Sequence, residues 1–317
     1  MKHLLRICLF FLSISNSVYS QGNNFKDEFG FRSDNDSYLA LGQDRYYTNG
    51  LFLSFRHALK QDTTWKYTAK KIWEIEAGQY IFNPQTGSIS DIQNVDRPFA
   101  SYLYAGGKFS WLFKNEQSFE LALNIGTIGP NALGEDIQEG LHKAIGFYPI
   151  KGWEFQVNNE MGVNSSFKYT RLIVRTQRNN DFILNTYANI GNTFAGAGAG
   201  VLFRAGRINQ LFKSVTTHSR ISNLKGGDSI PDKEIFFFTR PMLHFVAYDA
   251  TIQGGMFTEN KGPAVFEPNR FQYSQEFGVN YAKNRWTLNF AITFKSRDVE
   301  AQNRAHKYGS ATIYYRF

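Results

Sequence analysis

One segment of the sequence combines a histidine with a helical pattern of apolar residues. Residues 132–146 read ALGEDIQEGLHKAIG, and the apolar residues recur at four-residue spacing: Leu133, Ile137, Leu141 and Ile145. This spacing predicts an amphipathic helix that ends at Gly146. His142 lies one turn after Gln138, so the two polar side chains share a face beside the apolar stripe. A neutral imidazole at this place could act as a general base, although an ordinary surface histidine fits the same pattern.

Two clusters of oxygen-bearing side chains lie earlier in the chain. Residues 33–36 read SDND, and residues 44–50 read DRYYTNG. Carboxylate, amide and hydroxyl oxygens are the ligands that calcium takes in proteins, so the clusters could hold a divalent cation. Asn, Asp and Gly are also the usual residues of tight turns, and from residue types alone the turn interpretation stands beside the metal interpretation.

The available nucleophiles narrow the chemistry that these residues could perform. The one cysteine, Cys8, lies in the predicted leader, so the mature chain has no thiol for a nucleophile, a disulfide or a zinc site. No G-x-S-x-G motif occurs, and Ser54 is expected deeper in its strand than the polar clusters. We therefore expect His142 to activate a water molecule, with an acyl-enzyme on a serine as the alternative.

The N-terminal residues indicate an exported chain, and the net charge shows that it is basic. Residues 1–20 contain Lys2, Arg6 and a short apolar run that ends before Ser20, which predicts a signal peptide and a single mature domain over residues 21–317. The chain has 35 Lys+Arg and 27 Asp+Glu, and loss of the leader lowers the net charge from +8 to +6. A basic balance suits an anionic partner, although solvated loops explain it equally well.

Aromatic residues are frequent in a chain that is polar on average. It contains 30 Phe, 17 Tyr and 5 Trp, yet the mean hydropathy is −0.38. Strict alternation of apolar and polar residues produces this combination, and residues 286–295 show it without a break. The chain also ends on Phe317 after alternating aromatics, which resembles the signal read by the barrel assembly machinery of the outer membrane.

Alternating runs occur along the whole mature chain. They cover residues 25–31, 47–58, 72–82, 101–113, 118–128, 166–174, 182–190, 195–204, 235–248, 271–282, 286–295 and 310–317. About twelve strands are an even number, and their apolar faces carry uncharged rows of Trp, Phe and Leu. The sequence thus predicts a transmembrane antiparallel β-barrel, with a secreted β-sandwich as the alternative. The helix over residues 132–146 becomes an extracellular loop insertion, and residues 206–233 are expected to form a large mobile extracellular loop.

The order and spacing of several motifs over residues 25–170 resemble the lipid A 3′-O-deacylase family, LpxR. The motifs are Asn35-Asp36, the run 44–50, the DRPFA run 96–100, the IGPNALG run 128–134, Gln138, His142, Gly146 and the GWEFQ run 152–156. Beyond residue 170 the resemblance rests on strand rhythm and length.

The resemblance implies a twelve-stranded barrel with its active site between the outer wall and the loop helix. It implies calcium-dependent hydrolysis of the acyl or acyloxyacyl ester at the 3′ position of lipid A in the outer leaflet. His142 would be the base, Asn35 and Asp36 the metal-side pair, Thr48 a neighbouring hydroxyl, and Gln138 a further catalytic residue. The implied location is the outer membrane of a Gram-negative cell, as a monomer without a nucleic-acid partner.

Two positions depart from the family pattern. The loop over residues 83–94 has no lysine where enterobacterial members carry a functional one, so Lys143 or Lys151 near the helix are candidates for contacting the substrate. Tyr148 stands where some members have a carboxylate, which leaves the orienting partner of His142 open. A passive pore, or a barrel of this fold without activity, remains the alternative function.

Overall fold

The alternating segments form one closed barrel in the computed structural model, which describes residues 25–39, 44–62, 64, 66–176, 179–224 and 230–317. The twelve strands are β1 (Asp27–Asn35), β2 (Tyr46–Ala58), β3 (Thr68–Asn83), β4 (Ala100–Phe113), β5 (Gln117–Ile128), β6 (Glu160–Arg175), β7 (Asn180–Gly191), β8 (Phe194–Arg207), β9 (Lys233–Asp249), β10 (Phe271–Lys283), β11 (Trp286–Lys295) and β12 (His306–Arg316). Each strand pairs antiparallel with its sequence neighbours, and β1 pairs with β12 to close the sheet. The predicted fold class and strand number are confirmed. The predicted signal peptide lies outside the described residues.

The alternation of apolar and polar residues along each strand decides which side chains face outward and which face the barrel interior. On β11, Phe290 is 60% exposed on the outer surface, whereas Thr287 on the opposite face is fully buried. An outward apolar row and an inward polar row are what a barrel in lipid requires. Closure also matters, because an open sheet edge in hydrocarbon would leave backbone groups without hydrogen-bond partners. No helix among the described residues has the length and apolar character needed to cross a membrane.

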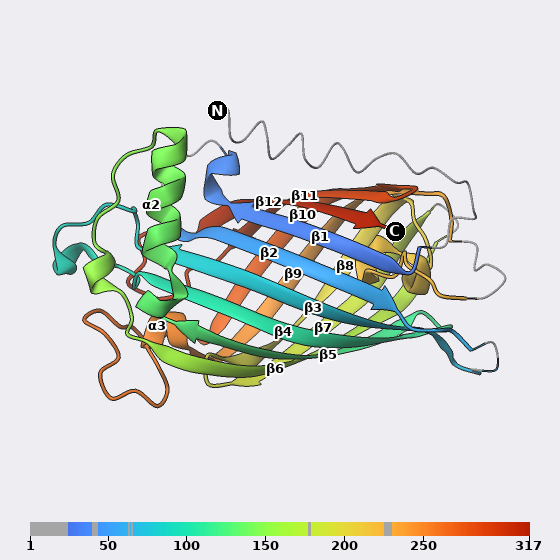
Figure 1. Cartoon of the computed structure of the whole chain (residues 1–317), viewed down its shortest axis with the longest axis horizontal. Coiled ribbons are helices and arrows are strands. Elements are labelled where there is room, and N and C mark those ends of the chain that lie inside the picture. The colour runs from blue at the N-terminus through green and yellow to red at the C-terminus, as the bar shows by residue number, and fades with distance from the viewer. Residues whose placement is uncertain (1–24, 40–43, 63, 65, 177–178, 225–229) are drawn as a thin grey trace.

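The two ends of the barrel differ in the length of their connections. Tight turns such as residues 284–285 lie at the end where β1 begins and β12 ends, whereas most of the long connections, including 84–99 and 129–159, lie at the opposite end. The connection over residues 208–232 is the exception. In bacterial outer-membrane barrels the short turns face the periplasm and the long loops face outward. The helix α2 (Gly134–Ile145) and the short helix α3 (Ala250–Gln253) are therefore extracellular, and α2 stands across the ends of β2 to β4 (Figure 1).

The expectation of a mobile extracellular loop at residues 206–233 is wrong. This connection joins β8 to β9 at the periplasmic end, because β8 begins at the extracellular end of the barrel and ends at the periplasmic end. Its described residues fold into the barrel mouth, where Ser219 and Ile221 are fully buried. The Lys70 Nζ donates a hydrogen bond of 2.7 Å to the Ser219 carbonyl oxygen. A polar, basic sequence was consistent with solvent exposure, but the barrel interior is also polar and accommodates it.

Candidate active site

The predicted helix forms, and it presents its polar side to the barrel. α2 ends at Gly146, whose φ of 77° is the left-handed conformation that favours glycine at this position. The residues that α2 buries are Gly134, Gln138 and His142, which recur every fourth position. The apolar stripe faces away from the barrel, with Ile145 64% exposed. In water this orientation would be unfavourable, whereas beside a lipid leaflet the exposed stripe has an apolar surrounding.

The outer wall under α2 is polar, which explains why the helix covers it. Alternation places Gln79 and Asn83 of β3 and Ser101 of β4 on the outer face, since their neighbours Tyr80 and Tyr102 point into the barrel. Gln79 Nε2 and Ser101 Oγ both donate to the Ala132 carbonyl oxygen, at 2.6 and 3.2 Å. The covering segment thus satisfies polar groups that would otherwise face hydrocarbon.

His142 is held through both ring nitrogens. Its Nδ1 lies 2.7 Å from the Tyr148 carbonyl oxygen, and its Nε2 lies 2.8 Å from Asp44 Oδ2. A carbonyl can only accept, so Nδ1 carries a proton in this arrangement. Nε2 is consequently the nitrogen that can exchange a proton, and Asp44 is its partner. The imidazole is 5% exposed, so its orientation is fixed by these contacts.

Asp44 belongs to a hydrogen-bond network that reaches the predicted polar corner. Tyr148 donates its hydroxyl to Asp44 Oδ2 at 2.6 Å. Thr48 Oγ1 lies 3.2 Å from Asp44 Oδ1 and 3.3 Å from Asp36 Oδ1, so it stands between the two carboxylates. The strand register shifts between Tyr47 and Asn49, and this bulge re-aims Thr48 from the regular alternation.

The pKa of Asp36 departs from its ordinary value. Burial raises the pKa of this carboxyl to about 7; the Arg45 backbone amide opposes the shift with a hydrogen bond, and the nearby Asp44 charge adds to it. Two carboxylates buried next to one hydroxyl repel each other when both are ionised. A cation between them would relieve this repulsion.

Amide groups with unused hydrogen-bonding capacity lie near the Tyr148 hydroxyl. Gln138 Oε1 accepts a hydrogen bond of 3.0 Å from Trp153 Nε1, while Gln138 Nε2 has no partner. Neither polar atom of the fully buried Asn83 side chain has one. A Cβ placed on Gly87 would lie 2.9 Å from the Tyr148 hydroxyl, 3.1 Å from Gln138 Nε2 and 3.2 Å from Asn83 Nδ2. The Tyr148 hydroxyl and the amide nitrogens of Gln138 and Asn83 therefore lie close together beside Gly87, and both amide nitrogens are free to donate a hydrogen bond.

The remaining predicted residues lie at different distances from this network. Asn35 is the last residue of β1; its amide oxygen accepts from the Ser37 backbone at 2.6 Å, and its amide nitrogen donates to Asn49. Lys143 lies on the exposed side of α2 and pairs with Glu139. Lys151 is exposed and pairs through its backbone with residues 87 and 89. The structure brings together His142, Asp36, Thr48 and Gln138, places Asn35 beside them, and leaves both lysines outside the network.

Sequence reasoning missed the immediate partners of His142. Asp44 appeared only as part of the polar cluster, and Tyr148 only as a departure from the family pattern. Asn83 was treated as a loop residue. The one local signal was the position of Asp44 at the start of the polar run over residues 44–50. Its contact with residues 142–148 is a tertiary contact, which no local sequence pattern predicts.

The donor chemistry agrees with a hard divalent cation. The described residues contain no group of three or more His, Cys, Asp and Glu side chains placed to hold a metal. Asp36 and the Thr48 hydroxyl lie 3.3 Å apart, and the amide oxygen of the neighbouring Asn35 keeps a second lone pair. These donors are all oxygen, which is the donor type that suits calcium rather than a softer metal.

A closed antiparallel barrel with a helix-covered polar site on its outer wall defines an outer-membrane protein whose site lies at the lipid boundary. The chain belongs to the LpxR family: the profile described as "Outer membrane protein LpxR" matches residues 4–317. The protein is accordingly located in the Gram-negative outer membrane.

A solved structure shows the same fold. LpxR from Salmonella typhimurium superimposes with a TM-score of 0.71 at 18% sequence identity, covering 92% of this chain and 100% of that one. The β domain of the Bordetella autotransporter BrkA gives a TM-score of 0.48 at 9% identity, with 92% and 99% covered. The comparison with curated proteins found no match.

Proposed function

We propose that this protein is a lipid A 3′-O-deacylase, a hydrolase that removes the ester-linked acyl or acyloxyacyl chain from lipid A in the outer leaflet. The observation that carries the proposal is the position of His142. Its imidazole is buried between the outer barrel wall and α2, beside the exposed apolar stripe of that helix. Membership of the LpxR family supports the same assignment.

His142 acts as the general base in this proposal. The Tyr148 carbonyl keeps the proton on Nδ1, so that Nε2 accepts the proton of a water molecule as the water attacks the ester carbonyl. The water takes the place of Asp44 beside Nε2, and Asp44 keeps hydrogen bonds from Tyr148 and Thr48. Its negative charge beside the ring stabilises the imidazolium that forms. The imidazolium then returns the proton to the 3′ oxygen of lipid A as the ester C–O bond breaks and the carboxylic acid leaves.

The negative charge that develops on the ester oxygen needs stabilisation. The amide nitrogens of Gln138 and Asn83, which have no hydrogen-bond partner, lie beside Gly87 and could donate to this oxygen. A calcium ion held by Asn35 and Asp36, with Thr48 adjacent, would supply further positive charge to the oxyanion when bound. Lys143 and Lys151, on the exposed side of this region, are candidates for contacting the lipid A phosphates.

The proposal is tested by comparing lipid A from cells with and without the protein. Mass spectrometry should detect the loss of one ester-linked acyl or acyloxyacyl group, and His142→Ala or a calcium chelator should abolish the difference. His57→Ala is a matched control, because His57 pairs with Asp27 at the periplasmic end. Unchanged lipid A masses with the wild-type protein would reject the deacylase assignment, and conductance in planar bilayers would then favour a pore.

Export and assembly belong to the same proposal. We infer that residues 1–20 are removed as a signal peptide, that the barrel assembly machinery recognises the strand ending at Phe317, and that the barrel works as a monomer. Sequencing of the mature N-terminus should begin at Gln21, and sedimentation in detergent should give the mass of one chain.

A further inference from the structure

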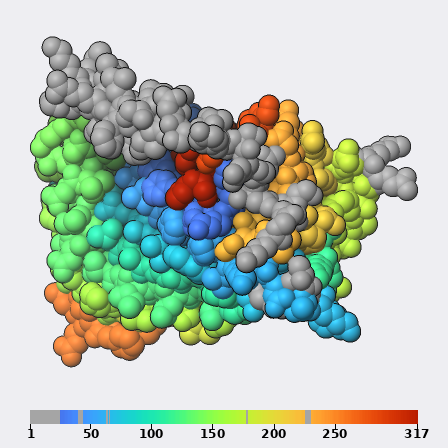
Figure 2. Space-filling model, turned by 45° about the vertical axis from the view of Figure 1, so that its right-hand side comes forward, coloured from blue at the N-terminus to red at the C-terminus, as the bar shows by residue number. Residues whose placement is uncertain are grey.

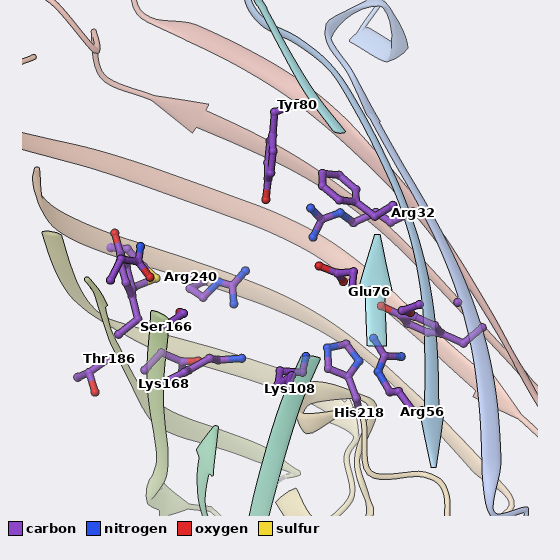
Figure 3. Close-up of a pocket in the computed structure, with 18 residues that line it drawn as sticks. Arg32, Arg56, Glu76, Tyr80, Lys108, Ser166, Lys168, Thr186, His218 and Arg240 are labelled. Atoms are coloured by element: carbon purple, nitrogen blue, oxygen red, sulfur yellow. The ribbon is translucent and has the colours of Figure 1, made fainter. Parts of the chain in front are cut away.

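A second polar site lies inside the barrel, separated from the proposed active site by the wall itself. A cavity of about 590 Å³ is lined by basic side chains from β1, β2, β4, β6 and β9: Arg32, Arg56, Lys108, Lys168 and Arg240. Glu76 is the carboxylate among its described lining residues. Figure 3 shows these cationic groups converging on one space.

The basic groups differ in how far carboxylates neutralise them. Arg56 contacts Glu28 and Glu74 at 2.9 and 2.6 Å, and Lys108 contacts Glu74 at 2.8 Å. Glu28 and Glu74 are almost fully buried and do not line the cavity, whereas Arg56 and Lys108 do. Arg240 pairs with Glu276, which does not line the cavity either. Five cations and one carboxylate, Glu76, thus line the cavity, so its lining carries a net positive charge.

Arg32 and Lys168 keep the most unneutralised charge. Arg32 makes one ion pair, at 3.4 Å to Asp34, and its guanidinium lies 3.8 Å over the Phe52 ring. Lys168 contacts Glu120 at 3.3 Å. Their side chains are 41% and 32% exposed, and both groups line the cavity. An anion there would gain more from these charges than in bulk water, because the surrounding wall has a lower dielectric constant.

The cavity continues toward one end of the barrel. A neighbouring hollow of about 320 Å³ shares Tyr187 and Asn189 with it and reaches Asp249 and Lys295, at the extracellular ends of β9 and β11. The polar interior thus extends from the cavity toward the extracellular end of the barrel.

The other end is covered by the connection between β8 and β9. His218 of that connection lines the cavity and packs edge-on against Tyr314, with ring centroids 5.5 Å apart. Arg204 anchors the same connection through hydrogen bonds to Ser214 and to the Asn209 carbonyl oxygen. Over the described residues the lumen therefore has the form of a blind cavity, which suits retention of a solute better than its passage.

We propose that the barrel interior binds a small soluble anion with two or more negative charges. Multivalency follows from the several cations around one space. The site faces the lumen, whereas His142 lies on the outer wall, so the proposal is independent of the deacylase activity.

Inorganic pyrophosphate is a suitable probe. We would fold the full chain in detergent micelles and measure binding of labelled pyrophosphate by equilibrium dialysis, without calcium and at constant ionic strength. We expect one ion per chain, and at least tenfold weaker binding in the double variant Arg32→Met/Lys168→Met. Lys143→Met, which removes an exposed cation from α2, should bind like the wild type.

Further variants separate the possible outcomes. Faster migration of the unheated protein in detergent gels reports a folded barrel; if the double variant does not fold, Arg32→Gln and Lys168→Gln should each weaken binding. His142→Ala should leave binding unchanged. The proposal is overturned if the wild type binds no pyrophosphate, if the folded lumen variants bind with wild-type affinity, or if His142→Ala alone abolishes binding.

Discussion

His142 and Asp44 come from two different extracellular loops, yet the imidazole Nε2 and the carboxylate Oδ2 lie 2.8 Å apart. Tyr148 contacts both partners. Its carbonyl oxygen accepts a hydrogen bond from His142 Nδ1, and its hydroxyl donates one to Asp44. One residue thus orients the proposed base and the carboxylate that faces it.

Removing the Asp44 carboxylate should slow hydrolysis. In Asp44→Asn the group that faces Nε2 is neutral and can present an amide N–H to it, so we expect kcat to fall about 10²-fold, as for loss of one acid–base element. Tyr148→Phe should give a smaller decrease, because the backbone carbonyl that fixes Nδ1 remains. Rates on purified lipid A measure both effects, with KM expected to change little.

Tyr46→Phe is the matched control for Tyr148→Phe. The Tyr46 hydroxyl donates to Asp96, outside the contacts of His142. Equal rates for the two tyrosine variants would contradict the orienting role of Tyr148.

The elevated pKa of Asp36 predicts a pH dependence of stability. A carboxyl whose folded-state pKa is raised from 3.8 to about 7 favours the folded state below pH 3.8, and this contribution is lost as the pH rises toward 7. Without calcium, the barrel should therefore lose stability between pH 4 and pH 7, and Asp36→Asn should lack this component. Chemical unfolding at several pH values compares the two proteins, and parallel profiles would argue against a buried, protonated Asp36.

Protons should also compete with calcium at this carboxyl. Because the cation requires ionised Asp36, calcium affinity should decrease as the pH falls below about 7. Titration calorimetry at pH 6 and pH 8 measures the difference. Equal affinities at the two pH values would place the cation away from Asp36.

Gly87 should be required for the space beside Gln138. A methyl group in Gly87→Ala would lie 2.9 Å from the Tyr148 hydroxyl and 3.1 Å from Gln138 Nε2, so it would displace these groups from their present positions. We expect activity to fall about tenfold or more while the barrel stays folded, since removal of one oxyanion donor costs about 10²- to 10³-fold.

Gly140→Ala provides the comparison for Gly87→Ala. Gly140 lies on the exposed side of α2, and a Cβ there would meet no atom within 4 Å. This change should leave activity intact and stabilise the helix by about 0.5–1 kcal/mol. If Gly87→Ala is as active as Gly140→Ala, the space near Gly87 takes no part in the reaction.

The exposed stripe of α2 should matter for lipid substrates alone. Leu141→Asp places a charge next to the acyl chains of the leaflet, so we expect KM for lipid A in membranes to rise about tenfold, corresponding to about 1.4 kcal/mol. Hydrolysis of a short, water-soluble ester should be unaffected, because His142 keeps its contacts. A parallel loss on both substrates would instead indicate damage to the site.

The outer wall on the same side of the molecule as α2 carries exposed apolar residues. The helix stands at one side of the face in Figure 2, beside the strands of the outer wall. Exposed apolar residues of those strands, including Leu123 and Ile125 of β5, make the wall lipid-facing next to the helix. The stripe and the wall therefore meet the same leaflet.

The sequence alone determined the strands, their inward and outward faces, and the helix from about residue 132 to Gly146. Those features depend on local periodicity, since alternation in a strand and four-residue spacing in a helix are properties of neighbouring residues. The pairing of Gln138 with His142 on one face followed for the same reason.

Only the tertiary structure decided which face of α2 turns inward, which residue meets His142, and at which end residues 208–232 lie. These features depend on contacts between segments far apart in the sequence, and on a surrounding that is lipid outside and polar inside. Under those conditions Leu141 is exposed and Gln138 is buried, the reverse of what burial in water would select.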